Sequence, residues 1–535
     1  MRTPSRHPLA KRWQSADRDG GHTPYFPAVS RVCVRDSAPR QRDELGEGNS
    51  MTGKEIVIAP RPVPYGSAAA DLSDEPFAIR MAARLGDTKR SVDRFVHELR
   101  YRPPRARTAR MLVLIPAHNE EATIAKTLDA LLTQSRVPDR IVVIADNCTD
   151  DTEKIARRYR GVTVMRTVDN HDRKVGALNQ AWRRWQAGYD FIAGIDADTQ
   201  LAPDCLQHLE EELANTPRAG GVMARYTFDQ RLGTTPMARL LIRLQRMEFA
   251  GWTMDALQKN RTTYVLGGQA SLFNADALRR VTERNNTPGP WDASAQVEDM
   301  QLTGDLRGMR YETLVSPNAR AHAGAMLTFR SLWAQRRKWD EGMARLLAKP
   351  QLSKWTATLW RQQLSLLSNG VTRLLFLFLL TFSLMVHQFV WSWWWLTPTV
   401  VASLLNARVA WTMPNRTMGD VVTAMLLLPV EAYLWFRLAC TTASWSNVLA
   451  GIKRDGWEDQ ARAERGASNG PGRIITAVAI VAVLAGLTVF GWLHAPLWLQ
   501  ERVLTVGWSL LAVVTVLQTL MMLIRLVRPS RGYRP

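Results

Sequence analysis

Cysteine is scarce in this sequence, and the spacing of the few residues excludes two kinds of site. The 535 residues include four cysteines, Cys33, Cys148, Cys205 and Cys440. They follow neither the paired spacing of a zinc site nor the dense spacing of a disulfide framework. We therefore interpret them as reduced thiols of a protein that faces the cytosol.

The N-terminal region lacks the basic-then-apolar order of a secretory signal. Residues 1–50 are rich in Arg, Pro, Ser, His and Gly and show no periodic apolar pattern. Residues 1–110 carry 21 basic and 13 acidic side chains, a balance that favours contact with an anionic membrane surface. We predict that residues 1–70 are disordered and that residues 71–109 form a basic amphipathic segment.

The excess of positive charge comes without a nucleic-acid-binding motif. Lys and Arg number 69 against 49 Asp and Glu, which gives a formal net charge of +20. Such an excess suits nucleic acid, an anionic membrane surface or a phosphate-bearing substrate. Because no DNA- or RNA-binding signature accompanies the charge, we predict no nucleic-acid partner and favour membrane lipids and a phosphate-bearing substrate.

Long uncharged runs gather in the last third of the chain. Four of them are expected to cross a bilayer: Leu374–Leu396, Val421–Ala439, Ile474–Leu493 and Val503–Ile524. The second contains Glu431 and Arg437, which need partners there. Arginine- and lysine-rich stretches at 452–473 and 525–534 are expected on the cytoplasmic side. A span at Val400–Met413 would reverse this orientation and is rejected. Residues 351–535 are therefore predicted to hold an interfacial helix and about four transmembrane helices in the cell (inner) membrane, with the catalytic domain cytoplasmic.

Apolar runs alternate with helical spacing from residue 110 onward. The predicted strands are Met111–Pro116, Ile141–Ala145, Val162–Arg166 and Phe191–Ile195, and the predicted helices are Glu120–Gln134, Asp151–Arg160 and Gly176–Ala187. This alternation predicts an α/β domain with a mostly parallel sheet over residues 110–350. Ligands of such sheets bind at the carboxyl ends of the strands, where the polar residues of this sequence cluster.

Paired carboxylates follow one of these strands. Asp196 and Asp198, one residue apart at a strand end, suit a divalent cation that also holds a diphosphate. Taken alone, the pair favours a turn, because Asp often hydrogen-bonds its own backbone. Glu298 and Asp299 are adjacent, so they point different ways, and one of them can act as a base while the other is structural.

Three further segments have both a structural and a functional interpretation. Pro116–Glu121 and Asp146–Asp151 combine a helix start with side chains that are free for a ligand. The basic pair Arg173-Lys174 precedes the predicted helix and suits phosphate, although a solvated loop charge is the commoner explanation. The predicted helix Thr328–Leu347 carries Gln-Arg-Arg-Lys-Trp at 335–339. It suits anionic lipid on one face, and a leaving diphosphate and a stacked sugar ring on another.

The order of these segments is more specific than any one of them. The stretches PAHNEE, DNCTDD, DRKVGALN, DAD, GGQA, ED and QRRKW follow one another over Met111–Trp339. The set resembles the family 2 glycosyltransferases, and especially the processive membrane synthases of cellulose, chitin, hyaluronan and poly-N-acetylglucosamine. The resemblance implies a GT-A-like nucleotide-sugar-binding domain followed by an α-helical transmembrane region.

The resemblance also implies roles for residues on the donor side. Asp146 would lie near the uracil, and Lys174 would approach the diphosphate. Asp196 and Asp198 would hold the sugar nucleotide, Asp198 chiefly through Mg²⁺ or Mn²⁺. The residues implied to line the nucleotide pocket are Pro116, His118 and Glu120.

On the acceptor side, the resemblance makes Asp299 the general base beside Glu298. Gln335 and Trp339 would bind the acceptor end. Those implied to shape the donor and acceptor pocket are Gly267, Gly268 and Gln269, and those implied to stabilise the leaving UDP are Arg336, Arg337 and Lys338. Lys338 stands where the family motif QxxRW has Arg, which keeps the charge but loses the bidentate geometry. The chain also has no span ahead of the catalytic domain, where many relatives have one.

These patterns predict a membrane-bound inverting glycosyltransferase. It would transfer a sugar, N-acetylglucosamine as the best choice, from a UDP-sugar to a growing β-linked polysaccharide. One alternative is a single transfer to a lipid carrier or glycolipid, and another is a scaffold whose decayed transferase domain only binds nucleotide. Accessory or oligomeric partners, the sugar and the linkage are left open by the sequence.

Overall fold

The computed structural model describes residues 109–349, 353–452, 454–466 and 472–530, with backbone alone for 472–481. All of them belong to the second of two compact units, Pro104–Pro535. The segments predicted at 1–70 and 71–109 lie outside the described residues, apart from Ala109.

An eight-stranded sheet of order β3-β2-β1-β4-β7-β6-β8-β5 is built from the first half of the described chain. Its strands are β1 (Met111–Ala117), β2 (Arg140–Ala145), β3 (Val162–Arg166), β4 (Phe191–Ile195), β5 (Gln200–Leu201), β6 (Ala219–Phe228), β7 (Ala270–Asn274) and β8 (Glu312–Ala323). Four of the seven neighbouring pairs are parallel, and β5 and β7 run antiparallel to their neighbours. The expected α/β domain with a mostly parallel sheet is confirmed.

Both faces of the sheet are buried, which explains the nearly continuous apolar runs of its first strands. Met111, Val113 and Ile115 pack on one face, while Leu112 and Leu114 pack on the other. The helices that flank the sheet or follow its strands are α3 (Ile124–Leu132), α4 (Thr152–Ala156), α5 (Arg173–Trp185), α6 (Cys205–Asn215), α8 (Ala275–Asn285) and α9 (Glu298–Gly308).

Three helix boundaries differ from the prediction. α3 begins at Ile124 rather than at residue 120, because the backbone N–H of Glu120 donates to Thr152 Oγ1 instead of opening a helix. α4 ends at Ala156, and the chain then turns through Gly161 at φ +83°. α5 begins at Arg173, so the prediction that Arg173 and Lys174 precede the helix is wrong. Lys174 lies in the first turn.

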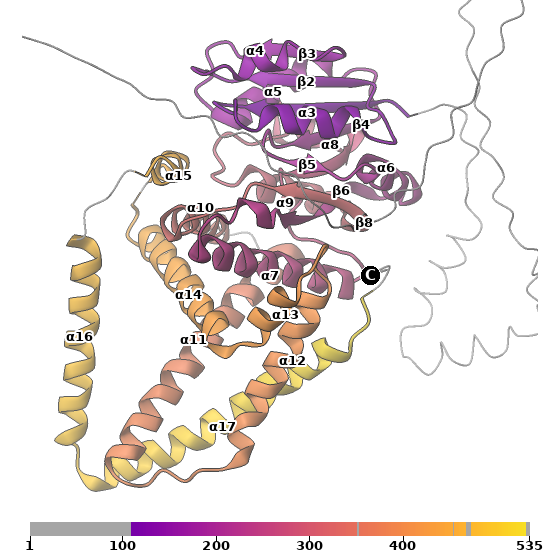
Figure 1. The fold of residues 1–535 in the computed structure, drawn as a ribbon. Coiled ribbons are helices and arrows are strands. Elements are labelled where there is room, and N and C mark those ends of the chain that lie inside the picture. The colour runs from indigo at the N-terminus through magenta and orange to yellow at the C-terminus, as the bar shows by residue number, and fades with distance from the viewer. Residues whose placement is uncertain (1–108, 350–352, 453, 467–471, 531–535) are drawn as a thin grey trace, which may run out of the picture. The chain divides into compact units, whose positions relative to one another are not determined.

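Two long helices join the sheet to the C-terminal helices (Figure 1). They are α7 (Pro236–Gln258) and α10 (Phe329–Leu347), and the short turn η2 (Gln230–Leu232) precedes α7. α10 begins where predicted, because Thr328 and Ser331 form a reciprocal capping box.

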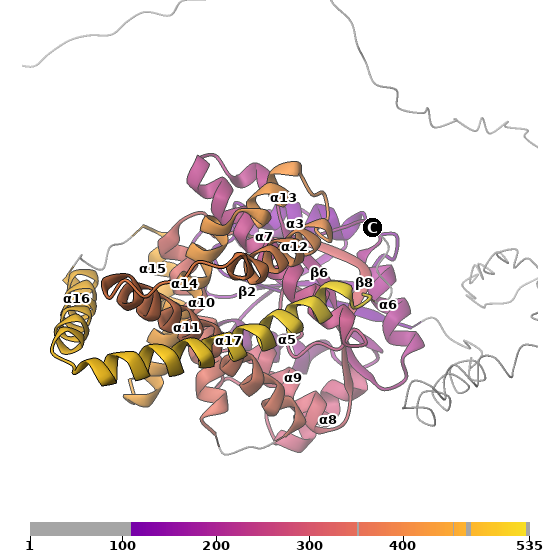
Figure 2. The ribbon, with the colours of Figure 1, turned by 90° about the horizontal axis from the view of Figure 1, so that it is seen from below.

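The remaining chain is helical. Its elements are α11 (Lys354–Met385), η3 (Trp393–Leu396), α12 (Thr397–Trp411), α13 (Met418–Met425), α14 (Leu427–Leu449), α15 (Gly456–Glu464), α16 (Gly472–Leu493) and α17 (Leu497–Val527). Seen from below, α17 crosses the domain beside α11 and α12 (Figure 2).

Over the described residues, two helices are long and apolar enough to cross a membrane, α11 and α17. The pair α13–α14, bent by 72°, makes a third if it is one span. The predicted span Val503–Ile524 lies within α17. The helix α16 covers the span predicted at Ile474–Leu493, and its described side chains, from Ala482 on, are apolar.

The span predicted at Leu374–Leu396 is wrong in its second half. α11 ends at Met385, and the chain then passes through His387 at φ +53°, a left-handed conformation that terminates helices. The rejected span at Val400–Met413 corresponds to α12, whose 15 residues reach only about 22 Å. α12 packs on α7 through Val409.

Candidate active site

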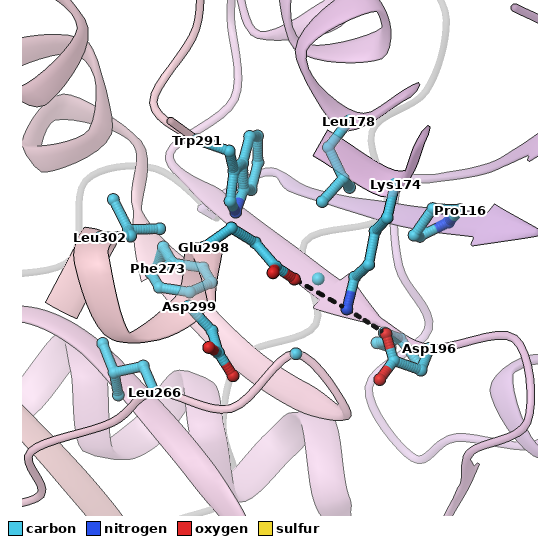
Figure 3. Close-up of a pocket in the computed structure, with 13 residues that line it drawn as sticks. Pro116, Lys174, Leu178, Asp196, Leu266, Phe273, Trp291, Glu298, Asp299 and Leu302 are labelled. Carbon is cyan, nitrogen blue, oxygen red and sulfur yellow. Dashed lines mark hydrogen bonds and ion pairs between the residues drawn. The ribbon is translucent and has the colours of Figure 1, made fainter. Parts of the chain in front are cut away.

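A small cavity lies at the carboxyl ends of β1 and β4 (Figure 3). Its polar lining residues are Lys174, Asp196, Glu298 and Asp299. Lys174 Nζ lies 2.6 Å from Asp196 Oδ1 and 3.3 Å from Glu298 Oε1. The remaining cavity measures about 20 Å³, space for about one water. The lysine therefore bridges the two predicted acidic motifs and fills most of the site.

The approach of Lys174 depends on a glycine and on paired charges. Burial lowers the pKa of Lys174, but the carboxylates of Asp196 and Glu298 outweigh it, so the pKa lies above its usual value. A side chain at Gly268 would collide with Lys174 Nζ. The predicted GGQA motif thus meets the predicted basic motif, and glycine leaves the space for the lysine head group.

Two further predicted site carboxylates, Asp198 and Glu120, have raised pKa values. Burial, together with repulsion from Asp196, raises the pKa of Asp198 to about 6. Burial raises the pKa of Glu120 to about 7 against a hydrogen bond from Thr123, and Asp198 and Asp196 add to the rise. Such carboxylates gain from a nearby cation. A Cβ at Gly324 would meet Asp198 Oδ2, so this glycine makes room for the carboxylate.

The donor set fits a divalent cation that substrate oxygens complete. Among the residues that the structure describes, no group of three or more His, Cys, Asp or Glu side chains is placed to hold a metal ion. Mg²⁺ is commonly held by one or two carboxylates together with substrate phosphates. Asp196 and Asp198 meet that requirement. Burial, together with repulsion from Asp196, raises the pKa of Asp198, and a cation between the two carboxylates would offset both effects.

Asp146 and His118 lie together at the ends of neighbouring strands. Asp146 is buried, and its Oδ1 accepts from Thr167 Oγ1 at 2.8 Å and from Asn170 Nδ2 at 2.7 Å. His118 Nδ1 lies 2.7 Å from the backbone oxygen of Asp146. The parallel pairing of β1 and β2 therefore brings two of the predicted nucleotide residues into contact.

Glu298 and Asp299 open α9, and their environments separate their roles. Glu298 is buried and faces Lys174. Asp299 Oδ1 accepts from the N–H of Met300 at 2.7 Å, and burial together with repulsion from Glu298 raises its pKa to about 7. A carboxylate with a pKa near the working pH is suited to general base catalysis. Asp299 is the better placed of the two for that role.

A larger cavity of about 350 Å³ begins at Asp299 and extends to the C-terminal helices. It is bounded by β6, α7, α9, α10, α11 and α14. Aromatic side chains are prominent in its lining: Tyr226, Phe249, Trp252, Tyr264, Trp339 and Trp355. Gly267, Gln269, Asp299 and Trp339 are the predicted site residues that line it.

The other residues of the Gln-Arg-Arg-Lys-Trp segment line neither cavity. Gln335 Oε1 accepts from Arg336, which is fully buried and bound by Glu248. Arg337 Nη2 lies 3.8 Å from Glu341 on its own helix. Lys338 Nζ lies 3.4 Å from the centre of the Trp457 ring, on α15.

The charges of the small cavity nevertheless affect the pKa of Lys338. Burial lowers its pKa to about 8, Lys174 lowers it further, and Glu298, Asp299 and Asp196 oppose the shift.

Comparison with known proteins fits this arrangement. Residues 112–282 match the model of the family described as Glycosyl transferase family 2. This part of the chain is a family 2 glycosyltransferase domain. The match confirms the resemblance drawn from the motifs, and it covers the sheet from β1 to β7 together with α8.

The glycosyltransferase domain also has curated relatives. Poly-beta-1,6-N-acetyl-D-glucosamine synthases of Staphylococcus epidermidis and of Staphylococcus aureus strain COL are each 26% identical to this chain over 235 residues. The match covers 43% of this chain and 53% of each relative, so the chain spans about half the length of the relatives it matches.

Solved structures are similar at lower identity. The mannosyltransferase PcManGT of Pyrobaculum calidifontis, in complex with GDP-Man and Mn²⁺, is 17% identical with a TM-score of 0.44, over 71% of this chain and 97% of that one. Residues 1–349 of TarS from S. aureus, in complex with UDP-GlcNAc, are 15% identical with a TM-score of 0.33, over 68% of this chain and 93% of that one.

Several residues of the glycosyltransferase domain were not predicted from the sequence. Trp291 lines the small cavity, and Phe249 and Trp252 of α7 line the large one. Tyr226 OH donates to the backbone oxygen of Gly267 at 3.1 Å and so supports the glycine loop. No predicted motif includes these residues, and the three-residue spacing of Phe249 and Trp252 on α7 is the signal that could have indicated two of them.

Proposed function

We propose that the protein is a membrane-bound inverting glycosyltransferase that adds a sugar from a UDP-sugar to a growing β-linked polysaccharide. The observation that carries the proposal is the position of Asp299, which lines both cavities. A base at that junction can act on an acceptor in the large cavity next to a donor at the small one. The name of the staphylococcal relatives supports N-acetylglucosamine as the sugar.

In the proposed reaction, Asp299 accepts the proton of the acceptor hydroxyl. The hydroxyl oxygen forms the new bond to the anomeric carbon as the bond from that carbon to UDP breaks, which inverts the configuration. The electron pair of that bond leaves with the diphosphate, whose charge Lys174 and Lys338 offset. The ion pairs of Lys174 with Asp196 and Glu298 must rearrange when the donor enters, because they fill the small cavity.

Asp196 and Asp198 would hold Mg²⁺ or Mn²⁺ in this scheme. When bound, the cation supplies positive charge to the diphosphate oxygens. Asp146 and His118 would then contact the nucleobase side of the donor, and Trp339 would stack on a sugar of the acceptor.

The proposed location is the cell membrane, with the catalytic domain on the cytoplasmic side. The two apolar helices α11 and α17 support contact with membrane lipids. Arg454, Arg462 and Arg465 support the orientation, because lysine and arginine in short loops next to spans are retained on the cytoplasmic side. The large cavity, where the acceptor would bind, is bounded by α11 and so lies beside a candidate span.

The deciding experiment offers single UDP-sugars to membranes that contain the full-length chain and sizes the products. We expect one UDP-sugar, UDP-N-acetylglucosamine, to release UDP and to yield long chains. A single sugar on a lipid-soluble product would favour transfer to a lipid carrier or glycolipid. Absence of UDP release with every donor would contradict the proposal.

A further inference from the structure

A buried cluster of charges lies beside the large cavity, and two of its members, Asp340 and Arg437, line that cavity. Glu248 of α7 accepts from Arg336 Nε at 3.0 Å and from Nη2 at 2.8 Å, both on the same oxygen. It also accepts from Tyr433 OH at 2.6 Å, and its other oxygen lies 3.1 Å from Arg437 Nε. Arg437 in turn pairs with Asp340 at 2.9 Å. We call these five residues the Glu248 cluster.

Arg336 connects this cluster to Trp339. The carbon at the centre of its guanidinium lies 4.5 Å from the centre of the Trp339 ring and 5.7 Å from that of Phe249. A guanidinium over an aromatic face at this distance is a cation–π contact. Trp252 lies 6.4 Å from the same indole. The ring of Trp339 is therefore held by a cation and by two aromatic side chains of α7.

The burial of Arg336 makes its geometry depend on Glu248. No part of Arg336 is exposed, and 91% of the Glu248 side chain is buried. A buried arginine without its carboxylate has a high free-energy cost. Burial raises the pKa of Glu248, but Arg336 and Arg437 lower it by more. The pKa therefore lies below its usual value, and the carboxylate stays ionised. Two N–H groups of one guanidinium on one carboxylate oxygen fix the side chain more closely than a single contact does.

We propose that Glu248 is a positioning residue for the acceptor site: through Arg336 it fixes the ring of Trp339 against which the acceptor sugar binds. The inference rests on the proposed function, because it takes Trp339 as the acceptor platform. It separates the segment at 335–339 into two parts. Arg336 contacts the ring of Trp339, whereas Lys338 contacts the ring of Trp457 on α15.

Neither Glu248 nor Arg336 lines the small cavity, so their loss is expected to affect acceptor and donor differently. A misplaced platform weakens acceptor binding and orientation. The contacts of Lys174 with Asp196 and Glu298 do not involve the cluster, so donor affinity is expected to persist. A general loss of fold would lower both together.

The experiment uses the full-length protein in detergent, with UDP-N-acetylglucosamine as donor and a short N-acetylglucosamine oligomer as acceptor. The variants are Glu248→Gln, Arg336→Gln, Arg336→Lys and the double variant of the two glutamine changes. Arg345→Gln is the control, because Arg345 is an arginine of the same helix that pairs with Glu341 away from both cavities. The measurements are kcat/KM for the acceptor, KM for the donor in its slow hydrolysis, and the unfolding temperature.

We expect Glu248→Gln to lower kcat/KM for the acceptor by about 10²-fold, the cost of a small misplacement of a reacting group, while the donor KM stays within about twofold. The double variant should match the single ones, because Glu248 acts through Arg336. Arg336→Lys keeps the charge but not the planar group, so it should fold and still lose acceptor kcat/KM. Arg345→Gln should behave like the wild type.

Two results would overturn the positioning role. One is a normal acceptor kcat/KM in Glu248→Gln or in Arg336→Lys, and the other is an equal loss of donor and acceptor affinity in the folded lysine variant. Failure of the proposed function looks different, because the wild-type protein would then release no UDP from this donor or from any other.

Discussion

At the scale of single residues, the site places a partly buried lysine between carboxylates of opposite charge. Lys174 forms ion pairs with Asp196 and Glu298. Asp299 is adjacent to Glu298, and among the described residues it forms no ion pair. Glu298 pairs with Lys174, whereas burial and repulsion from Glu298 raise the pKa of Asp299. Two adjacent acids of the same chain thus acquire different chemistry from their surroundings.

Asp299→Asn is the first prediction at this scale. The amide keeps the size of the side chain but cannot take a proton, so sugar transfer should fall by ~10²–10⁴-fold, the usual contribution of a general base. Binding of the UDP-sugar should persist, because Lys174, Asp196 and Asp198 are unchanged. The check is UDP release compared with donor binding in the same preparation. Near-normal turnover would remove Asp299 from the role of base.

The pH dependence of kcat/KM is the second prediction. The base must be deprotonated to act, and the pKa of Asp299 in the free protein is raised to about 7 by burial and by Glu298, against the effect of Lys174. Activity should therefore be low below pH 6 and rise through pH 7. It should fall again above pH 8, because burial lowers the pKa of Lys338 to about 8 and this lysine then loses its charge. Asp196 adds to the rise of this pKa and faces the same cavity. A rate that falls steadily between pH 6 and pH 8 would contradict this assignment.

Metal removal tests the carboxylate pair. Activity should be lost in excess chelator and return with Mg²⁺ or Mn²⁺, because Asp196 and Asp198 repel each other and the diphosphate unless a cation lies between them. Asp198→Ala should lose donor affinity as well as rate. Gly324→Ala should do so more mildly, since a Cβ there meets Asp198 Oδ2 without removing the carboxylate. Full activity in chelator would exclude a metal role.

At the scale of elements, α10 serves two sites at once. Its Trp339 lines the large cavity. Its Lys338 contacts the ring of Trp457 on α15, and the charges of the small cavity affect the pKa of this lysine. The helix spacing explains the division, because neighbouring positions of a helix face directions about 100° apart. The predicted diphosphate and acceptor roles of this segment therefore belong to different faces.

Trp339→Ala is the prediction for this element. Loss of the indole removes the stacking surface from the large cavity but none of the small-cavity contacts, so long product should disappear while UDP-sugar binding and slow hydrolysis remain. Product length per enzyme at matched expression is the measurement. Trp339→Phe serves as the matched variant, because it keeps an aromatic face. Long polymer from the alanine variant would mean that Trp339 only anchors the helix.

At the scale of the whole molecule, charged contacts join the C-terminal helices to one another and to α7 and α10. Glu431 of α14 binds Arg373 of α11 through two contacts of 2.7 Å, and Arg437 reaches Glu248 and Asp340. Charged side chains in apolar segments are costly unless paired. The two charges that the sequence placed in the span Val421–Ala439 therefore do have partners.

Glu431→Gln tests the ion pair between α11 and α14. Arg373 would lose its carboxylate, and the helix pair α11–α14 should be destabilised by about 1 kcal/mol, typical of polar contacts between membrane helices. The readout is the unfolding temperature of the purified protein in detergent, together with transfer activity. The double change Arg373→Met and Glu431→Leu, which leaves no unpaired charge, should recover most of the loss. A single variant as stable as the wild type would show that the pair is dispensable.

The sequence alone determined the local features of this protein. Alternating apolar runs predicted β1 to β4, because strands buried on both faces need continuous apolar side chains. Motif order identified the glycosyltransferase family. The sequence also predicted Lys174, Asp196, Glu298 and Asp299 as site residues from their residue types, and all four line one cavity. Helix ends were less certain, because Glu120 and Arg173 use their backbone in contacts with distant residues or adopt positive φ.

Only the tertiary structure decided which side chains meet. Glu248 belongs to no motif, and its contact with Arg336 joins residues 88 positions apart. The family resemblance assigned Arg336 to the leaving UDP together with Arg337 and Lys338, yet in the structure Arg336 is bound by the carboxylate of Glu248 on α7. The role of a charged residue depends on its nearest opposite charge in space, and that partner is fixed by the packing of the helices rather than by the order of the residues.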